Sequence, residues 1–119
     1  MLPQRLANAD LAWVPVSKMT EYLLNPLNPR AGGKPDDFAK MGYDKQNIEV
    51  LESDLLSVVQ NYPPIEERET PDWVTYRVEG YITTPRDGNR YIRTVWEIRP
   101  DDPKPRLVTA YPVRPPSGG

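Results

Sequence analysis

The chain contains no cysteine and no histidine, and these absences restrict its possible chemistry. Without cysteine it has no disulfide, no thiol nucleophile and no thiolate metal ligand. Without histidine it lacks the usual general base and the commonest metal ligand, so an acid–base step has to use Asp, Glu, Lys or Tyr. The pairs Asp36-Asp37 and Asp101-Asp102 are too few and too separated in the chain for an oxygen-ligand site. We therefore expect no metal and no cofactor.

Long apolar runs are also missing. No run approaches the 18 or so residues of a transmembrane helix, and the N-terminus lacks the apolar core of a signal peptide. The absence of cysteine fits a reducing compartment. We expect a soluble, cytoplasmic protein that makes no membrane contact. The length of 119 residues predicts a single domain over 1–119, with a core at about 6–112 and a flexible tail at 113–119.

Charge is unevenly distributed behind the net value of −2. Residues 1–72 carry 7 basic and 12 acidic side chains, whereas residues 73–119 carry 8 basic and 5 acidic. A basic C-terminal half favours a polyanionic partner for that part of the molecule. The alternative is that these are ordinary solvated arginines on strands.

Three helices are predicted in the first half of the chain, over residues 19–24, 36–41 and about 45–60. Ser17 is expected to cap the first helix and Asp44 the third, and Gly42 to end the second. The third helix has an apolar stripe that would pack on a sheet, formed by Ile48, Leu51, Leu55, Val58 and Val59.

The second half of the chain predicts strands. Residues 61–72 are acidic and proline-containing and are interpreted as a linker. Strands are expected at 73–82, 90–99 and 106–111, with a hairpin at Asp87-Gly88 between the first two. A fourth strand from residues 9–16 would be confined to an edge by Pro15. The prediction is an α+β domain, with N-terminal helices packed on one face of a C-terminal antiparallel meander of three to four strands.

The two last predicted strands carry the candidate site. Their alternation suggests a cationic sheet face with a carboxylate, suited to binding or cutting a phosphodiester. The catalytic candidates, with a contribution from the Gly32-Gly33-Lys34 loop, are Lys34, Arg93, Glu97, Thr109 and Tyr111. Lys34 and Arg93 would bind phosphate, Glu97 or Tyr111 would act as base, and Thr109 would position the phosphate. Further RNA-binding candidates are Arg30, Arg77, Arg99 and Arg106.

Each of these features also has a plain structural reading. Opposite charges on neighbouring strands commonly form cross-strand pairs. The Gly-Gly-Lys loop is no Walker motif and can be a simple connection. Aromatic residues on strands are usually core, although exposed ones can stack on bases. The aromatic residues in question are Trp73, Tyr76, Tyr81, Tyr91 and Trp96.

An ordered set of motifs over residues 6–112 resembles an uncharacterised bacterial family of small toxin-associated domains. These motifs are Leu6-Ala-Asn-Ala-Asp10, Lys18-Met-Thr-Glu-Tyr-Leu-Leu-Asn-Pro26, Asn28-Pro-Arg-Ala-Gly-Gly-Lys34 with Phe38 and Gly42, Arg93-Thr-Val-Trp96, and Pro105-Arg-Leu-Val-Thr-Ala-Tyr-Pro112. Members look like stand-alone proteins or C-terminal modules of toxins, often encoded beside a second small protein. The family pattern often has histidine where this chain has Asn28, so no role is carried over to that position.

The predicted fold is similar to that of the barnase–EndoU–colicin–RelE group of toxin ribonucleases, an analogy at the level of fold. This resemblance implies RNA, either tRNA or mRNA, as substrate and a small cognate antitoxin-like protein as partner. The first hypothesis is therefore a metal-independent endoribonuclease of a toxin–antitoxin or related conflict system. The alternative is a non-catalytic interaction module, such as an antitoxin, an immunity protein or a regulatory partner. Cleavage of RNA and harm on expression alone separate the two.

Overall fold

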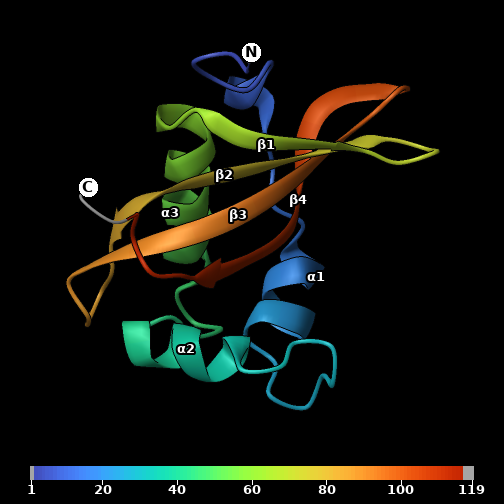
Figure 1. Ribbon diagram of the computed structural model, residues 1–119. Helices are drawn as coiled ribbons and strands as arrows, with labels where there is room; N and C mark the ends of the chain where they lie inside the picture. Colours follow the sequence, from blue (N-terminus) through green and yellow to red (C-terminus); the bar gives the residue numbers. More distant parts are fainter. Residues whose placement is uncertain (1, 117–119) are drawn as a thin grey trace.

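The chain places its helical segments before its strands, as the computed structural model shows for residues 2–116 (Figure 1). Short helical turns, η1 (Ala9–Leu11), α1 (Val16–Lys18) and the π-helical η2 (Met19–Leu23), precede the longer helices α2 (Lys34–Met41) and α3 (Ile48–Asn61). Four strands follow, β1 (Pro64–Glu69), β2 (Val74–Thr83), β3 (Asn89–Arg99) and β4 (Asp102–Pro112). The predicted α+β fold is confirmed.

The sheet is an antiparallel meander in the order β1-β2-β3-β4. The β2–β3 hairpin is regular, and in it Glu79 lies opposite Arg93. Between β3 and β4, irregularities follow Val95 and Glu97 and shift the pairing. The predicted hairpin is present, and Gly88 adopts a φ of 62° in its loop, a conformation that favours glycine.

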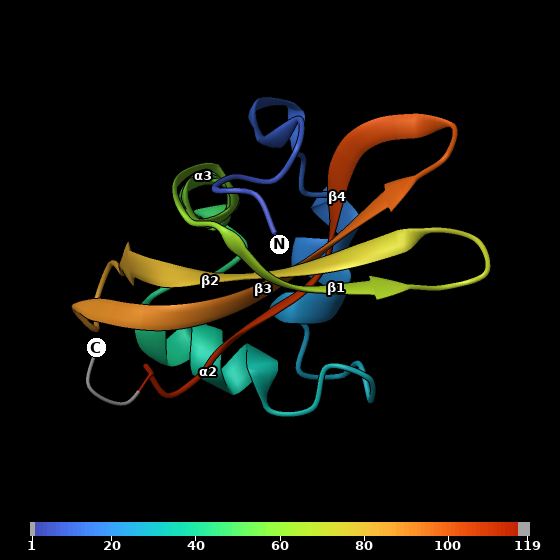
Figure 2. The same ribbon diagram turned by 45° about the horizontal axis from the view of Figure 1, so that its top comes forward.

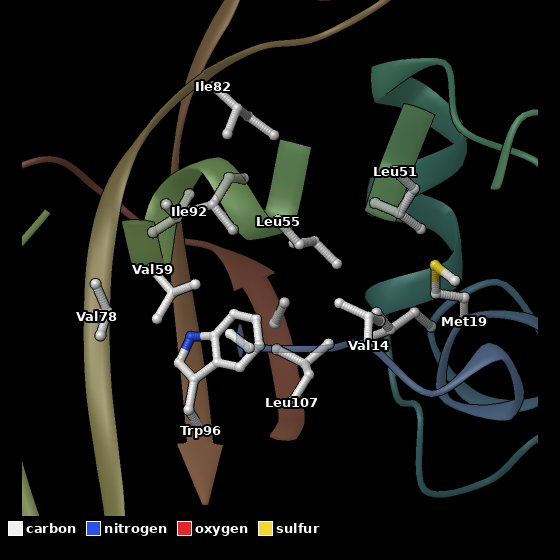
Figure 3. Close-up of a cluster of buried hydrophobic side chains, with 14 of the residues drawn as sticks. Val14, Met19, Leu51, Leu55, Val59, Val78, Ile82, Ile92, Trp96 and Leu107 are labelled. Carbon is white, nitrogen blue, oxygen red and sulfur yellow. The ribbon is translucent and has the colours of Figure 1, made fainter. Parts of the chain in front are cut away.

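Helix α3 covers one face of the sheet, called here the inner face (Figures 1 and 2). Four of the five predicted stripe residues are fully buried, and Ile48 packs at the margin of the core. Figure 3 shows the helix side chains Leu55 and Val59 near Val78, Ile92 and Trp96 of the sheet. The apolar stripe therefore packs as predicted, because burying it removes the largest apolar surface of the chain from water.

Polar groups within this core are bonded to one another. The indole N–H of Trp96 donates to the Thr94 hydroxyl at 2.7 Å, and that hydroxyl donates to the Val78 carbonyl at 2.7 Å. Both side chains are completely buried. The chain of bonds satisfies two donors that would otherwise be costly to bury.

The predicted linker was wrong, because half of residues 61–72, Pro64–Glu69, form the edge strand β1. Four of its six side chains are charged and all but Pro64 are exposed, so it has no apolar alternation. It is held instead by backbone pairing with β2 and by polar side-chain contacts. Examples are Tyr76 donating to Glu67 at 2.6 Å and Arg77 lying 3.5 Å from Glu66. An edge strand that is rich in charge avoids pairing with other chains.

The N-terminal segment does not supply a fourth strand, although it does touch the β4 edge. Trp13 donates its backbone N–H to Pro105 and accepts one from Leu107, which makes an isolated parallel bridge. The predicted caps also differ. Ser17 lies inside α1, after Pro15 at the N-cap, and α3 starts after Asn47. Asp44 instead accepts the backbone N–H groups of the preceding turn, from Gln46 and Asn47.

Gly42 ends α2, as predicted. Its φ of 100° is unfavourable for any residue with a side chain. Of the predicted tail, residues 113–116 have no helix or strand, and residues 117–119 lie outside the described part of the chain.

Candidate functional site

The face of the sheet turned away from α3, called here the outer face, carries most of the predicted site residues. Strand alternation on β2 and β3 and the pairing with β4 decide which side chains point there. In register, Arg93 lies between Glu79 on β2 and Tyr111 on β4, and Val95 lies opposite Thr109. Helix α2 packs beside β4, and Tyr22 of η2 bonds to Thr109 of β4, which brings in residues that the sheet itself lacks.

Five side chains meet at that border and form what we call the Lys34 cluster: Tyr22, Lys34, Arg93, Thr109 and Tyr111. The Lys34 ammonium lies 5.3 Å from the ring centres of both Tyr22 and Tyr111. The Arg93 guanidinium lies 5.7 Å from the Tyr111 ring centre, and its Nη1 is 3.4 Å from the Tyr111 hydroxyl. The hydroxyls of Tyr22 and Thr109 are 3.3 Å apart. Two cations and three hydroxyls therefore converge on one place.

Local sequence explains how the cluster is positioned. Lys34 is the first residue of α2, after the Gly32-Gly33 loop and before Pro35, which suits the first helical turn. Tyr22 lies on the π-helical turn η2, which is the kind of helical irregularity often found at functional sites. Lys18, one helical turn earlier, places its own ammonium 5.1 Å from the Tyr22 ring centre.

Tyr22 is electrostatically unusual. Burial opposes ionisation of its hydroxyl, but hydrogen bonding to Thr109 and the ammonium groups of Lys34 and Lys18 outweigh that opposition. The pKa of Tyr22 is consequently lower than that of an ordinary tyrosine. A phenol with a lowered pKa beside two cations is a candidate proton acceptor.

Arg93 is held in place from two sides. Its Nε donates to the carboxylate of Glu79, whose side chain is only 8% exposed. The same carboxylate oxygen lies 3.2 Å from Arg77. The hydrogen bond to Tyr111 raises the pKa of Arg93; burial acts against this, and Glu79 adds to it. Because guanidinium has five N–H donors, these contacts still leave donors for an anion.

A hollow of about 300 Å³ opens on the outer face beside Arg93 and Tyr111. Its lining is mostly polar and includes Arg68, Thr75 and Arg77 as well as Val95. Two members of the Lys34 cluster, Arg93 and Tyr111, therefore line an open depression that contains three arginines and one acidic side chain, Glu66.

Glu97 is not part of this cluster, although the sequence had placed it there. It is the next carboxylate along the face of β3, with a side chain 9% exposed. Its Oε1 lies 3.4 Å from Arg99 Nη2 and 3.5 Å from Arg106 Nη1. The carboxylate beside Arg93 is Glu79. The structure thus brings together Lys34, Arg93, Thr109 and Tyr111, and puts Glu97 in a second group with Arg99 and Arg106.

The four predicted RNA-binding arginines are dispersed. Arg77 lines the hollow beside Arg93, and Arg99 and Arg106 lie around Glu97. Arg30 is exposed in the loop before α2, and its recorded contact is the backbone N–H that it donates to Asn28.

Tyr22 and Glu79 were missed by the sequence reasoning. Tyr22 falls within the first predicted helix and was given no role there, but its spacing of four residues from Lys18 puts a cation over its ring, which is a usable signal. Glu79 lies opposite Arg93 because the loop between β2 and β3 spans residues 84–88. Counting outward from Asp87-Gly88 as a two-residue turn would have placed it opposite Trp96 instead.

Two further searches concern the described part of the chain only. Residues 2–116 contain no group of three or more acidic side chains placed to hold a metal ion. Within the same residues, no helix has the length and apolar character needed to cross a bilayer.

Comparison with known proteins gives a family and a fold. A family described as a domain of unknown function (DUF6883) matches residues 5–114. No curated protein matches the sequence. Among solved structures, the fold is similar to a chain of a contact-dependent growth inhibition toxin–immunity protein complex from Klebsiella pneumoniae 342. The TM-score is 0.69 at 13% identity, and the match covers 91% of this chain and 98% of that one. At that identity the similarity establishes the fold alone.

Proposed function

We propose that this chain, which belongs to the DUF6883 family of domains of unknown function, is a toxin-like, metal-independent endoribonuclease of a bacterial conflict system. The observation that carries the proposal is the Lys34 cluster, in which a lysine and an arginine converge with Tyr22, Tyr111 and Thr109 beside an open hollow. These side chains supply every group that RNA transesterification needs, in a chain without histidine.

The reaction assigns one task to each group. The 2′-oxygen of the ribose attacks the adjacent phosphorus, and the bond from phosphorus to the 5′-oxygen breaks. Tyr22, as phenolate, accepts the proton of the 2′-hydroxyl, and Tyr111 donates its phenolic proton to the departing 5′-oxygen. The products are a 2′,3′-cyclic phosphate and a 5′-hydroxyl end. Proton exchange with water then restores both tyrosines.

Lys34 and Arg93 stabilise the charge that develops on phosphorus in this scheme. The Lys34 ammonium lies 5.3 Å from both ring centres, so a phosphate bound to it would be close to both tyrosines. Thr109 bonds to the Tyr22 hydroxyl and would donate to it once it is ionised. Preorganised cations of this kind contribute strongly in enzymes, since removing one such donor costs about 10²–10³ in rate.

The conflict-system part of the proposal draws on the fold. The similar solved chain comes from a complex described as a growth inhibition toxin with its immunity protein. By analogy, we expect this chain to act on tRNA or mRNA in the cytoplasm of a target cell and to be neutralised by a small cognate protein. An inhibitor that covers the outer face would block the hollow.

The test is cleavage of end-labelled total tRNA by the purified protein in EDTA. The wild type should yield discrete fragments with cyclic-phosphate ends. Lys34→Ala should reduce cleavage by about 10²–10³, whereas Lys40→Ala, which removes the same charge from the exposed last turn of α2, should not. Lys34→Gln and thermal melts separate loss of charge from loss of fold. Equal cleavage by Lys34→Ala and Lys40→Ala would contradict the assignment.

A second function, a non-catalytic interaction module, is favoured by one specific observation. The four arginines Arg77, Arg93, Arg99 and Arg106 are all paired with the nearly buried carboxylates Glu79 and Glu97. Such pairs can be a rigid recognition surface for a protein. Expression of the chain alone distinguishes the functions. A toxin harms the cell and is neutralised by its partner, whereas an immunity-like module is harmless alone and still forms a stable complex.

A further inference from the structure

A second group of side chains lies on the outer face, farther along β3 and away from the Lys34 cluster. It contains two stacked pairs, with Arg106 over Trp13 at 5.6 Å from the ring centre and Arg99 over Trp73 at 4.4 Å. Glu97 lies between the arginines and contacts both. A small hollow of about 100 Å³ opens here, and its lining includes Trp13, Glu97 and Lys104.

We propose that this group, called here the Trp13 subsite, binds a nucleobase of single-stranded RNA that flanks the scissile bond. The proposal rests on the ribonuclease function inferred above. Every nucleobase has a flat aromatic face, and an exposed, fixed tryptophan is a strong platform for it. Trp13 is 41% exposed, although it is one of the largest apolar side chains in the protein.

Trp13 is fixed before any ligand arrives. Its backbone N–H donates to Pro105 at 2.9 Å, and its carbonyl accepts from Leu107 at 3.1 Å, which ties it to β4. Arg106 is in turn oriented by Glu97. A residue with a paired backbone and a ring that packs against an oriented arginine loses little conformational freedom when a base stacks on it. Keeping a large apolar ring both rigid and exposed to water does not favour stability, but it prepares the ring for binding a ligand.

The arginines add capacity for a polar ligand. Arg106 Nε is buried and has no hydrogen-bond partner among residues 2–116, which is uncommon for a buried donor. Arg99 and Lys104 supply positive charge at the rim. The opposing charges in the lining are Glu97, which contacts both arginines, and Asp102, which accepts the backbone N–H of Lys104.

Geometry connects this subsite with the Lys34 cluster. Glu97 lies four residues beyond Arg93 on the same face of β3, which corresponds to about 13 Å. The larger hollow beside Arg93 and Val95 occupies the interval. A short single strand can run along this path, within the lower part of the range of ~4–16 nucleotides that single-strand binding domains cover. A duplex keeps its bases stacked inside and cannot offer one to Trp13.

The experiment measures binding of a 2′-O-methyl RNA strand, which cannot be cleaved because it has no free 2′-hydroxyl. Fluorescence anisotropy of the labelled strand gives the affinity of the wild type, Trp13→Leu, Trp13→Phe and Arg106→Gln. We expect Trp13→Leu to weaken binding about tenfold or more and Trp13→Phe to restore most of it, because phenylalanine keeps an aromatic face. Tyr81→Leu, which removes an exposed ring elsewhere on the sheet, is the matched control and should bind normally.

The outcomes separate this inference from the ribonuclease proposal. Unchanged binding by folded Trp13→Leu would overturn the subsite, even if RNA is still cleaved. An equal effect of Tyr81→Leu, or equal Trp13 dependence for duplex RNA, would also overturn it. Loss of binding to a cognate protein with normal RNA binding would assign the surface to a protein instead. Trp13-dependent binding without any cleavage would support the subsite and count against the nuclease.

Discussion

Glu79 and Glu97 offer the sharpest test of how the outer face is organised, because they are similar residues with different surroundings. Each is a nearly buried carboxylate shared by two arginines. Glu79 accepts a hydrogen bond from Arg93 and lies 3.2 Å from Arg77. Glu97 lies 3.4–3.5 Å from its two partners, at the limit of hydrogen bonding. We predict that Glu79→Ala destabilises the protein clearly more than Glu97→Ala does.

The magnitudes follow from distance and exposure. Removing one member of a buried ion pair costs about 3–5 kcal/mol. Arg93 and Arg77 are 29% and 31% exposed, so water recovers part of their solvation, and we expect about 2–3 kcal/mol for Glu79→Ala. The partners of Glu97 are 43% and 40% exposed. Their longer contacts resemble surface pairs, and we expect roughly 0.5–1 kcal/mol for Glu97→Ala.

The assay is urea unfolding followed by tryptophan fluorescence and circular dichroism, with the slope of the transition required to be unchanged. At this size, each kcal/mol corresponds to about 3–5 °C in Tm. Arg93→Ala should cost less in the Glu79→Ala background than in the wild type, because the two residues share one interaction. Equal destabilisation by the two glutamate variants, or full additivity of Glu79→Ala and Arg93→Ala, would refute the reasoning.

Three further predictions concern the site and the core. Tyr22→Phe should lower RNA cleavage by about 10²-fold or more. Because a base must be deprotonated, the wild-type rate should rise with pH up to the lowered pKa of Tyr22. The same pH–rate profile for the wild type and Tyr22→Phe would exclude Tyr22 as the base. Leu55→Ala, at a fully buried position of α3, should cost about 3 kcal/mol in urea unfolding, and a loss below ~1 kcal/mol would mean that α3 does not form the core. Gly42→Ala should destabilise the protein by about 1–3 kcal/mol, because φ is 100° and the added carbon would lie 2.9 Å from Pro85. The control is Gly33→Ala, whose added carbon would have nothing within 4 Å. This control should be close to neutral in thermal melts.

Much of the fold could be predicted where apolar residues repeat regularly. The stripe of α3 and the alternation of β2 and β3 are direct consequences of one-sided burial, so periodicity locates them. The strand β1 could not be found in this way. It is an exposed edge, its side chains are charged, and its pairing depends on the backbone of β2. An exposed edge position and backbone pairing leave no periodic pattern of apolar residues in the sequence.

Part of the candidate site could also be predicted from the alternation of side chains along the strands. Arg93 and Tyr111 lie on neighbouring strands, and alternation suggests that they share a face. The positions of Tyr22 and Lys34 depend instead on how η2 and α2 pack against the β4 side of the sheet. That packing is tertiary, and no local spacing encodes it. Lys34 was singled out only through its glycine-rich loop.

The pairing of Arg106 with Glu97 depends on one of the two irregularities between β3 and β4, which no sequence pattern predicts. In a regular strand, Arg106 would point to the opposite face from Thr109 and Tyr111, because it precedes them by three and five positions, both odd. The shift in β3–β4 pairing after Val95 reverses this and brings Arg106 to the outer face, opposite Glu97. Glu97 thereby gains Arg106 beside Arg99, whereas Glu79 is the carboxylate that orients Arg93. One extra residue in β4 thus completes the group around Glu97, which is suited to binding, next to a cluster that is suited to phosphate chemistry.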